Sequence, residues 1–191
     1  MSYQLKQESG VALIELVLVV PLLALLYFGS VEMNEVIQVS QRGDYLARQV
    51  ALGVFHECKD LDVADGKPYP QADAKQCVQS QVELFSMEPS EDIRAGAVVV
   101  SLYVWESGQP RLVTKSRGCR SSLESVAGFY CSDAVSKYGI DRVKNELGGV
   151  LQKTEWIVIV ESFLPHESLL RGVWGLTKQQ ADYLLYSEVL I

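Results

Sequence analysis

One apolar segment near the N-terminus constrains this chain more than any other feature. Residues 11–31 read VALIELVLVVPLLALLYFGSV, and Glu15 is the only charged residue among them. A helix rises about 1.5 Å per residue, so this length is enough to cross a hydrocarbon core of about 30 Å. A cleavable secretory signal would have an apolar region of only about 7 to 15 residues and a small-x-small site, which is not evident after Phe28. The segment therefore predicts a single transmembrane helix.

The flanking charges give the expected orientation. Lys6 precedes the span, whereas Glu32 and Glu35 follow it before the first basic residue, Arg42. Basic residues favour the cytoplasmic side of a membrane. We expect the N-terminus in the cytoplasm and the C-terminal domain outside it.

Glu15 is the informative residue of the span, because a carboxylate inside a membrane usually has a partner. One interpretation is that it lies one helical turn inside the span and extends to the interface. In the other, the chain is cut after Gly10, which gives Val11 a free α-ammonium and makes Glu15 the fifth residue of the new chain. The carboxylate can then pair with that amine at i, i+4, or with the amine of a neighbouring subunit.

A proline stands in the middle of the same span. Pro21 removes one backbone donor and predicts a kink or a local loosening of the helix. Membrane helices tolerate such a residue when neighbouring helices satisfy the freed carbonyl, which hints at packing against other helices.

These residues resemble the prepilin superfamily, whose members carry a glycine before the cut and a glutamate at mature position five. The stretch GVALIELVLVVPLLALLYFGSVE is most similar to the TadE-like family of tight-adherence (Flp) pilus assembly proteins. The resemblance covers residues 10–32 well and the rest of the chain only in outline. The matching positions are Gly10, Glu15, Pro21, Phe28, Gly29 and Glu32.

The resemblance implies a processing site and a location. A prepilin peptidase on the cytoplasmic face would cut between Gly10 and Val11, so residues 1–10 would be a leader, 11–31 the transmembrane helix and 32–191 an extracytoplasmic α+β domain. The chain would be a minor pseudopilin of the bacterial inner membrane with its domain in the periplasm. Its partners would be the peptidase, other pilins or pseudopilins, and the pilus assembly platform.

Two other functions remain open. A type II secretion pseudopilin usually has Phe after the cut and a longer run before any proline, so Val11 and Pro21 argue against that machine. A signal-anchored periplasmic binding or sensor domain would make Gly10 and Glu15 coincidental.

The four cysteines predict disulfides if the domain lies outside the cytoplasm, because their number is even and their spacing is that of loops. Free buried thiols in a cytosolic domain are the alternative, which the membrane segment disfavours. Four cysteines allow three connectivities, and we expect the pairing of sequence neighbours, Cys58 with Cys77 and Cys119 with Cys131. A metal pair made by His56 and Cys58 is a minor alternative, and we expect no metal site.

A helical pattern continues beyond the span to about His56, with an apolar stripe and a possible bend at Gly43. The stripe comprises Val36, Val39, Leu46, Val50 and Val54. Residues 59–70 are predicted to form a loop, and Gln71–Met87 a second helix that ends before Pro89.

After Gly96 the sequence changes to a β pattern. Residues 97–105 predict a strand, 107–110 a turn and 111–115 the returning strand, followed by a Gly- and Ser-rich region over 116–134. A short helix is expected within 133–151, a strand over 155–164 that Pro165 stops, and a last strand over 181–191. For that tail, a capping box at Thr177–Gln180 offers a helix as the alternative. The predicted fold class is α+β, a long helix packed on a small antiparallel sheet.

No enzyme can be assigned from the remaining motifs. His56 and His166 have no local motif, Ser162 lacks a nucleophile elbow, and Gly148-Gly149 is expected to be a turn rather than a phosphate cradle. A net charge of −7 and a pI near 4.9 argue against nucleic-acid binding. We expect no catalytic residue and no cofactor.

Two further features have ordinary structural interpretations. Asp60, Asp62 and Asp65 depart from the spacing of a calcium loop and read as a solvated acidic loop. Trp156 and Trp174 are expected to be core or interface aromatics.

Overall fold

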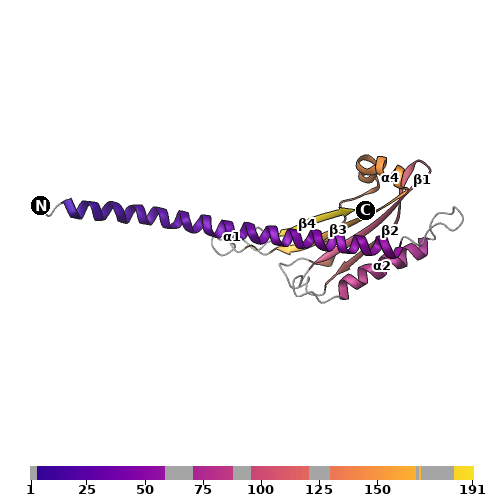
Figure 1. The fold of residues 1–191 in the computed structure, drawn as a ribbon, viewed down its shortest axis with the longest axis horizontal. Helices are drawn as coiled ribbons and strands as arrows, with labels where there is room; N and C mark the ends of the chain where they lie inside the picture. Colours follow the sequence, from indigo (N-terminus) through magenta and orange to yellow (C-terminus); the bar gives the residue numbers. More distant parts are fainter. Residues whose placement is uncertain (1–3, 59–70, 88–95, 121–129, 167, 169–182) are drawn as a thin grey trace.

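The computed structural model describes residues 4–58, 71–87, 96–120, 130–166, 168 and 183–191. It has the α+β class expected, with one long N-terminal helix and a four-stranded antiparallel sheet. Figure 1 shows that the first half of the helix projects away from the domain, while its second half lies along the sheet.

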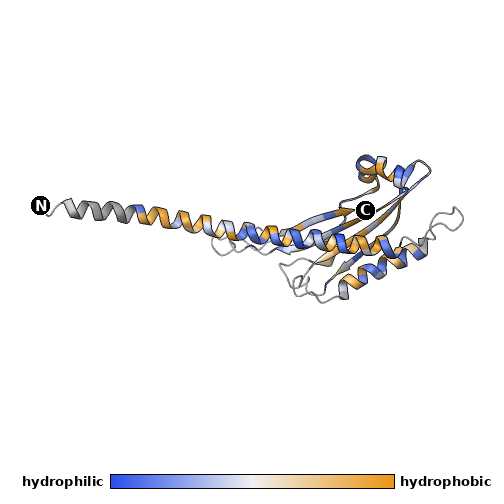
Figure 2. Cartoon of the chain, in the orientation of Figure 1, coloured by the Kyte–Doolittle hydropathy of each residue, from blue (hydrophilic) through white to orange (hydrophobic). Residues whose placement is uncertain are grey.

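Helix α1 runs from Gln4 to Cys58. Figure 2 shows that the coloured stretch of its projecting part is mostly apolar, whereas polar residues become frequent where the helix meets the domain. The helix passes through Pro21 without interruption, so the expected local loosening does not break it.

The sheet has the strand order β2-β1-β3-β4, and every neighbouring pair is antiparallel. Its strands are β1 (Ala97–Glu106), β2 (Gln109–Cys119), β3 (Trp156–His166) and β4 (Tyr183–Leu190). Strands β1 and β3 are central and almost fully buried, which explains their continuous runs of Val and Ile.

One face of the sheet, called here the α1 face, packs against α1 and against α2 (Gln71–Met87). Alternate residues of each strand point to this face, as the period of two requires. The predicted stripe of α1 supplies its half of this core through Leu46, Val50 and Val54, with Val39 partly buried beside them. The other members include Ala47, Ala51, Val78, Val82, Phe85, Val98, Val100, Leu102, Val158, Val160 and Leu164.

The opposite face carries a short helical segment after a 3₁₀ turn, η2 (Cys131–Asp133). The segment is α3 (Ile140–Arg142), a π turn, η3 (Val143–Leu147), and α4 (Gly148–Thr154). It covers the apolar residues of this face that β1 and β3 contribute, Tyr103, Ile157 and Ile159. The helix expected within 133–151 is therefore present, but Gly148 and Gly149 begin α4 instead of forming a turn.

The hairpin of β1 and β2 is tighter and longer than predicted. Ser107 and Gly108 both have positive φ and form the whole turn, so Gln109 and Pro110 already belong to β2. Proline is tolerated there because β2 is an edge strand. At its other end β2 continues to Cys119 by pairing with the buried start of β1, which residues 116–119 alone did not reveal.

The other strands agree with the prediction apart from their ends. Strand β3 continues through Pro165 to His166, because the pairing with β1 ends at Phe163 and no strand among the described residues needs a hydrogen bond from Pro165. The tail forms the strand β4. The predicted loop at 59–70 with its aspartates, Trp174, and the capping box at 177–180 lie outside the described residues.

Close packing of α2 on β2 depends on Gly118, and we predict that Gly118→Ala destabilises the domain by about 1–3 kcal/mol. An added Cβ would meet the side chain of Val82 and lie 2.8 Å from the Val82 carbonyl oxygen. The control is Gly53→Ala in α1, where the nearest atom is the free end of the Gln81 side chain, also at 2.8 Å. Thermal unfolding of the full chain in detergent, followed by near-ultraviolet circular dichroism, measures both; equal melting temperatures would contradict the prediction.

Candidate membrane helix and its junction with the domain

The projecting part of α1 is the first candidate site. By length and composition α1 is the one helix among the described residues that is apolar and long enough to cross a membrane. Every large apolar side chain from Leu16 to Phe28 is exposed, for example Leu18 at 69% and Leu26 at 64%. The domain therefore leaves this stretch uncovered.

The residues of the predicted processing and packing sites all lie on this projecting helix. The bond between Gly10 and Val11 is within α1, and Glu15 is exposed one turn further on. Phe28 makes an edge contact with Tyr27 and is 46% exposed, and a Cβ at Gly29 would meet no atom within 4 Å. Glu15, Pro21 and Phe28 are therefore all exposed on the projecting helix.

The first described contact between the projecting helix and the sheet is a buried pair. Glu32, one residue beyond the predicted span, lies 2.9 Å from Nε2 of His166 at the end of β3. The His166 side chain is 1% exposed and that of Glu32 is 13% exposed. Burying a polar group costs free energy unless it is hydrogen-bonded, so this contact helps to fix the position at which α1 meets the sheet.

Two further polar contacts continue the line from Glu32 along α1. The Ser162 hydroxyl on β3 donates to the Gly43 carbonyl at 3.1 Å, and the Ser187 hydroxyl on β4 donates to the Asp44 carboxylate. A Cβ at Gly43 would lie 3.1 Å from the Ser162 hydroxyl oxygen. Gly43 is thus the point of close approach between helix and sheet rather than a bend.

These contacts form what we call the polar seam: Glu32–His166, Gly43–Ser162 and Asp44–Ser187. Sequence reasoning gave no role to His166 or Ser162. A signal was present, because Ser162, Leu164 and His166 alternate with Phe163 and Pro165 and so share one face of the strand. What the sequence could not supply was the part of α1 that this face would meet.

A second polar cluster lies on the opposite face. Glu161 and Glu188 stand directly across from each other on β3 and β4, and the Tyr186 hydroxyl contacts both, at 3.0 and 2.5 Å. The Tyr138 hydroxyl donates to Glu188 at 2.8 Å, and the Tyr103 hydroxyl donates to the Tyr138 carbonyl at 3.0 Å. These five residues form the tyrosine–glutamate cluster.

The electrostatics of this cluster favour neutral phenols. Burial and then the hydrogen bond to Glu188 raise the pKa of the Tyr138 hydroxyl to about 12. Burial, followed by the same carboxylate, also raises the pKa of Tyr186, and burial with the charge of Glu161 raises that of Tyr103. Through these hydrogen bonds the cluster joins β3, β4 and residues 137–138.

Among the described residues, no group of three His, Cys, Asp or Glu side chains could hold a metal ion.

Trp156 is a core aromatic as expected, since it stacks on Phe55 with ring centroids 5.5 Å apart and packs against the main core.

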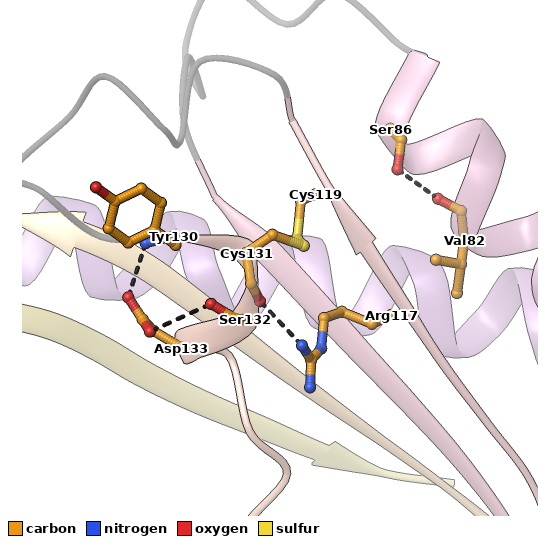
Figure 3. The surroundings of a disulfide bond; sticks show 8 residues. All are labelled: Val82, Ser86, Arg117, Cys119, Tyr130, Cys131, Ser132 and Asp133. Carbon is orange, nitrogen blue, oxygen red and sulfur yellow. Dashed lines mark hydrogen bonds between the residues drawn. A yellow bond between two sulfur atoms is a disulfide. The ribbon is translucent and has the colours of Figure 1, made fainter.

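Both disulfides have the expected pairing. Cys58–Cys77 joins the end of α1 to α2, and Cys119–Cys131 joins the end of β2 to η2. Figure 3 shows the second bond beside the Arg117 guanidinium, which donates to the Cys131 carbonyl at 3.2 Å. Each disulfide therefore ties a helical segment to the element that follows or precedes it.

The geometry defines a class of protein, an α+β domain on an exposed apolar helix. No family model, no curated protein and no solved structure matches this chain.

We predict that Glu32→Ala lowers the free energy of unfolding by about 1–3 kcal/mol, because it removes a partner of the buried His166 ring. Glu32→Gln is the matched control, since its amide oxygen can still accept a hydrogen bond, and should lose clearly less. Chemical unfolding of the full chain in detergent measures both variants. An alanine variant as stable as the wild type would show that the pair does not hold the helix to the sheet.

The raised pKa of Tyr138 predicts a loss of stability at alkaline pH. The folded domain favours the neutral phenol, so this contribution is complete below the ordinary pKa near 10 and disappears as the pH rises towards 12. Glu188→Gln should lower the pKa of Tyr138, while burial keeps it above 10. The pKa of Tyr138 is measured by titrating tyrosinate absorbance in the wild type and in the Glu188→Gln chain, each minus the titration of the same chain with Tyr138→Phe. The same pKa of Tyr138 in both chains would contradict the role of Glu188 in raising it.

Proposed function

We propose that this chain is a minor pseudopilin of the TadE-like type, which acts in the assembly of a tight-adherence pilus. In this proposal α1 crosses the bacterial inner membrane once, with the N-terminus in the cytoplasm and the disulfide-bonded domain in the periplasm. The protein acts through helix packing and protein–protein contacts, without a catalytic residue, a cofactor or a nucleic-acid partner.

The observation that carries the proposal is the separation of α1 into two parts. From Leu16 to Phe28 its large apolar side chains are exposed, and from Leu46 its apolar stripe is buried in the core. An exposed apolar surface of this kind needs a cover. The apolar segment to which it belongs, residues 11–31, is long enough to cross a bilayer. Glu32 and His166 lie at the boundary, so the domain would begin where the helix leaves the lipid.

Glu15 is the residue that distinguishes the proposed pseudopilin from a simple membrane anchor. Cleavage between Gly10 and Val11 would place an α-ammonium one helical turn from this carboxylate, and the exposed position of Glu15 leaves it accessible to its own or a neighbouring amine. Pairing would neutralise a charge that is costly in lipid, and pairing between chains would set the register of bundled helices. Gly10 also weakens the helix at the bond to be cut.

The test is the intact mass and N-terminal sequence of the full chain, expressed with and without a prepilin peptidase. We predict a mature terminus at Val11 only when the peptidase is present. Gly10→Leu should abolish the cut, and Glu15→Gln should reduce processing or the association of the mature chains; Gln38→Glu, on the exposed part of α1 outside the span, is the control substitution.

Two other outcomes would overturn the proposal in different ways. A Met1 terminus under both conditions would indicate a signal-anchored periplasmic domain. A terminus near Gly29 would identify the span as a signal peptide, and the membrane mechanism would fail with it.

A further inference from the structure

Strand β4 has a free edge among the described residues. Ile191 and Val158 exchange both of their backbone hydrogen bonds, at 2.9 and 3.1 Å. Because such pairs alternate along an antiparallel ladder, the N–H and C=O groups of Leu184, Tyr186, Glu188 and Leu190 face away from β3. No described strand pairs with them, and an unpaired edge of this length is a template for another strand.

Strand β2 forms the other edge of the same sheet. Its half from Thr114 to Cys119 is regular, since the bulge falls at Val113. The ladder makes β2 antiparallel to β1 and β4 antiparallel to β3, so β2 and β4 run in opposite directions. A copy of the chain moved sideways, without being turned over, therefore presents its β2 antiparallel to β4.

The membrane span restricts which pairing two copies can make. Two β4 strands can pair antiparallel only about a twofold axis normal to the sheet, and such an axis reverses every direction in the sheet plane. Since α1 lies along the sheet, the two projecting helices would then point in opposite directions (Figure 1). Two chains anchored in the same orientation can instead join β4 to β2.

We propose that the β4 edge of one copy pairs with the β2 edge of the next copy, so that the sheet continues from chain to chain with all α1 helices parallel. This inference rests on the membrane span of the proposed function, but not on leader cleavage or on a pilus. The contact is head to tail, so it builds rings or filaments rather than closed twofold dimers.

The exposed charges of the two edges are complementary. Glu188 on β4 stands opposite Glu161 on β3, which stands opposite Val99 on β1, and Val99 in turn stands opposite Arg117 on β2. Glu188 and Arg117 therefore lie on one line across the sheet, and Leu190 and Lys115 lie on another. All of these side chains are on the opposite face of the sheet, so the acidic edge of one copy would meet the basic edge of the next. Opposite charges across an interface set partner and register.

The helix layer repeats this complementarity. Arg48 and Leu52 of α1 line a groove with the residues 188–191 beside β4, and Arg48 forms no ion pair with a described residue. In α2, Cys77 and Gln81 face α1. Glu83 is about 120° from Cys77 and about 160° from Gln81 around the helix, so it lies towards the outer flank. Continuing the sheet would bring the α2 of the next copy, with Glu83, alongside Arg48.

The test uses full-length protein in phosphatidylethanolamine–phosphatidylglycerol vesicles, with Leu190→Cys and Lys115→Cys in the same chain and a bis-maleimide cross-linker. The native cysteines are disulfide-bonded and do not react. The expected product is a ladder of dimers, trimers and larger species. Each single-cysteine variant should remain monomeric, and a dimer of the Leu190→Cys chain alone would indicate twofold β4 pairing and overturn the proposal.

Charge reversal in the double-cysteine chain identifies the surface. Arg48→Glu should reduce the ladder about tenfold, and adding Glu83→Arg should restore it, because like charges facing each other oppose binding. Both residues are exposed and outside the core, so the domain should keep its fold. Absence of a ladder, or a ladder that neither reversal changes, would refute the proposal.

The N-terminal mass of the same samples separates this inference from the proposed function. A chain cut at Gly10 that gives no ladder refutes the edge pairing alone. An uncut chain that gives the ladder refutes the pseudopilin assignment and leaves the edge pairing in place.

Discussion

The docking of α1 on β3 and β4 is the interaction on which the rest of the structure depends. Its buried stripe completes the main core, and without it one face of β3 and β4 would be exposed. The close approach at Gly43 and the buried Glu32–His166 pair fix where along its length the helix meets the sheet. Burial of apolar surface provides the affinity in such a contact, and the polar seam provides its register, since an unpaired buried group would be costly in any shifted position.

Local patterns in the sequence were enough to predict the elements and the disulfides. The apolar run at residues 11–31, the helical stripe ending in Val54, and the stretch rich in Val, Leu, Tyr and Trp after Gly96 are each local signals of the element that forms there. The ends were predicted less well. Strand β2 ends at Cys119 because this residue pairs with Ala97, the first residue of β1. Pro165 can stay in β3 because the pairing with β1 does not extend beyond Phe163. Both reasons come from a neighbouring strand.

The polar contacts are the part of the structure that could least be predicted from a single sequence. Glu161 and Glu188 would be read as solvent-facing charges in a strand, yet Glu161 is fully buried and they stand opposite each other with Tyr186 between them. Their meeting requires the register of β3 with β4, which no residue in either strand specifies alone. Glu15, by contrast, could be singled out at once, because its meaning depends on the apolar residues next to it in the chain.

The direction of α1 relative to the sheet has a mechanical consequence. A pull on the projecting end of the helix is directed along its axis, and therefore along β3 and β4, so it loads the polar seam and the core contacts in shear and all at once. Beyond them the Cys58–Cys77 bond attaches the far end of the helix covalently to α2. The domain therefore holds α1 by many contacts along its length, an arrangement suited to a helix that bears tension while the rest of the molecule stays folded.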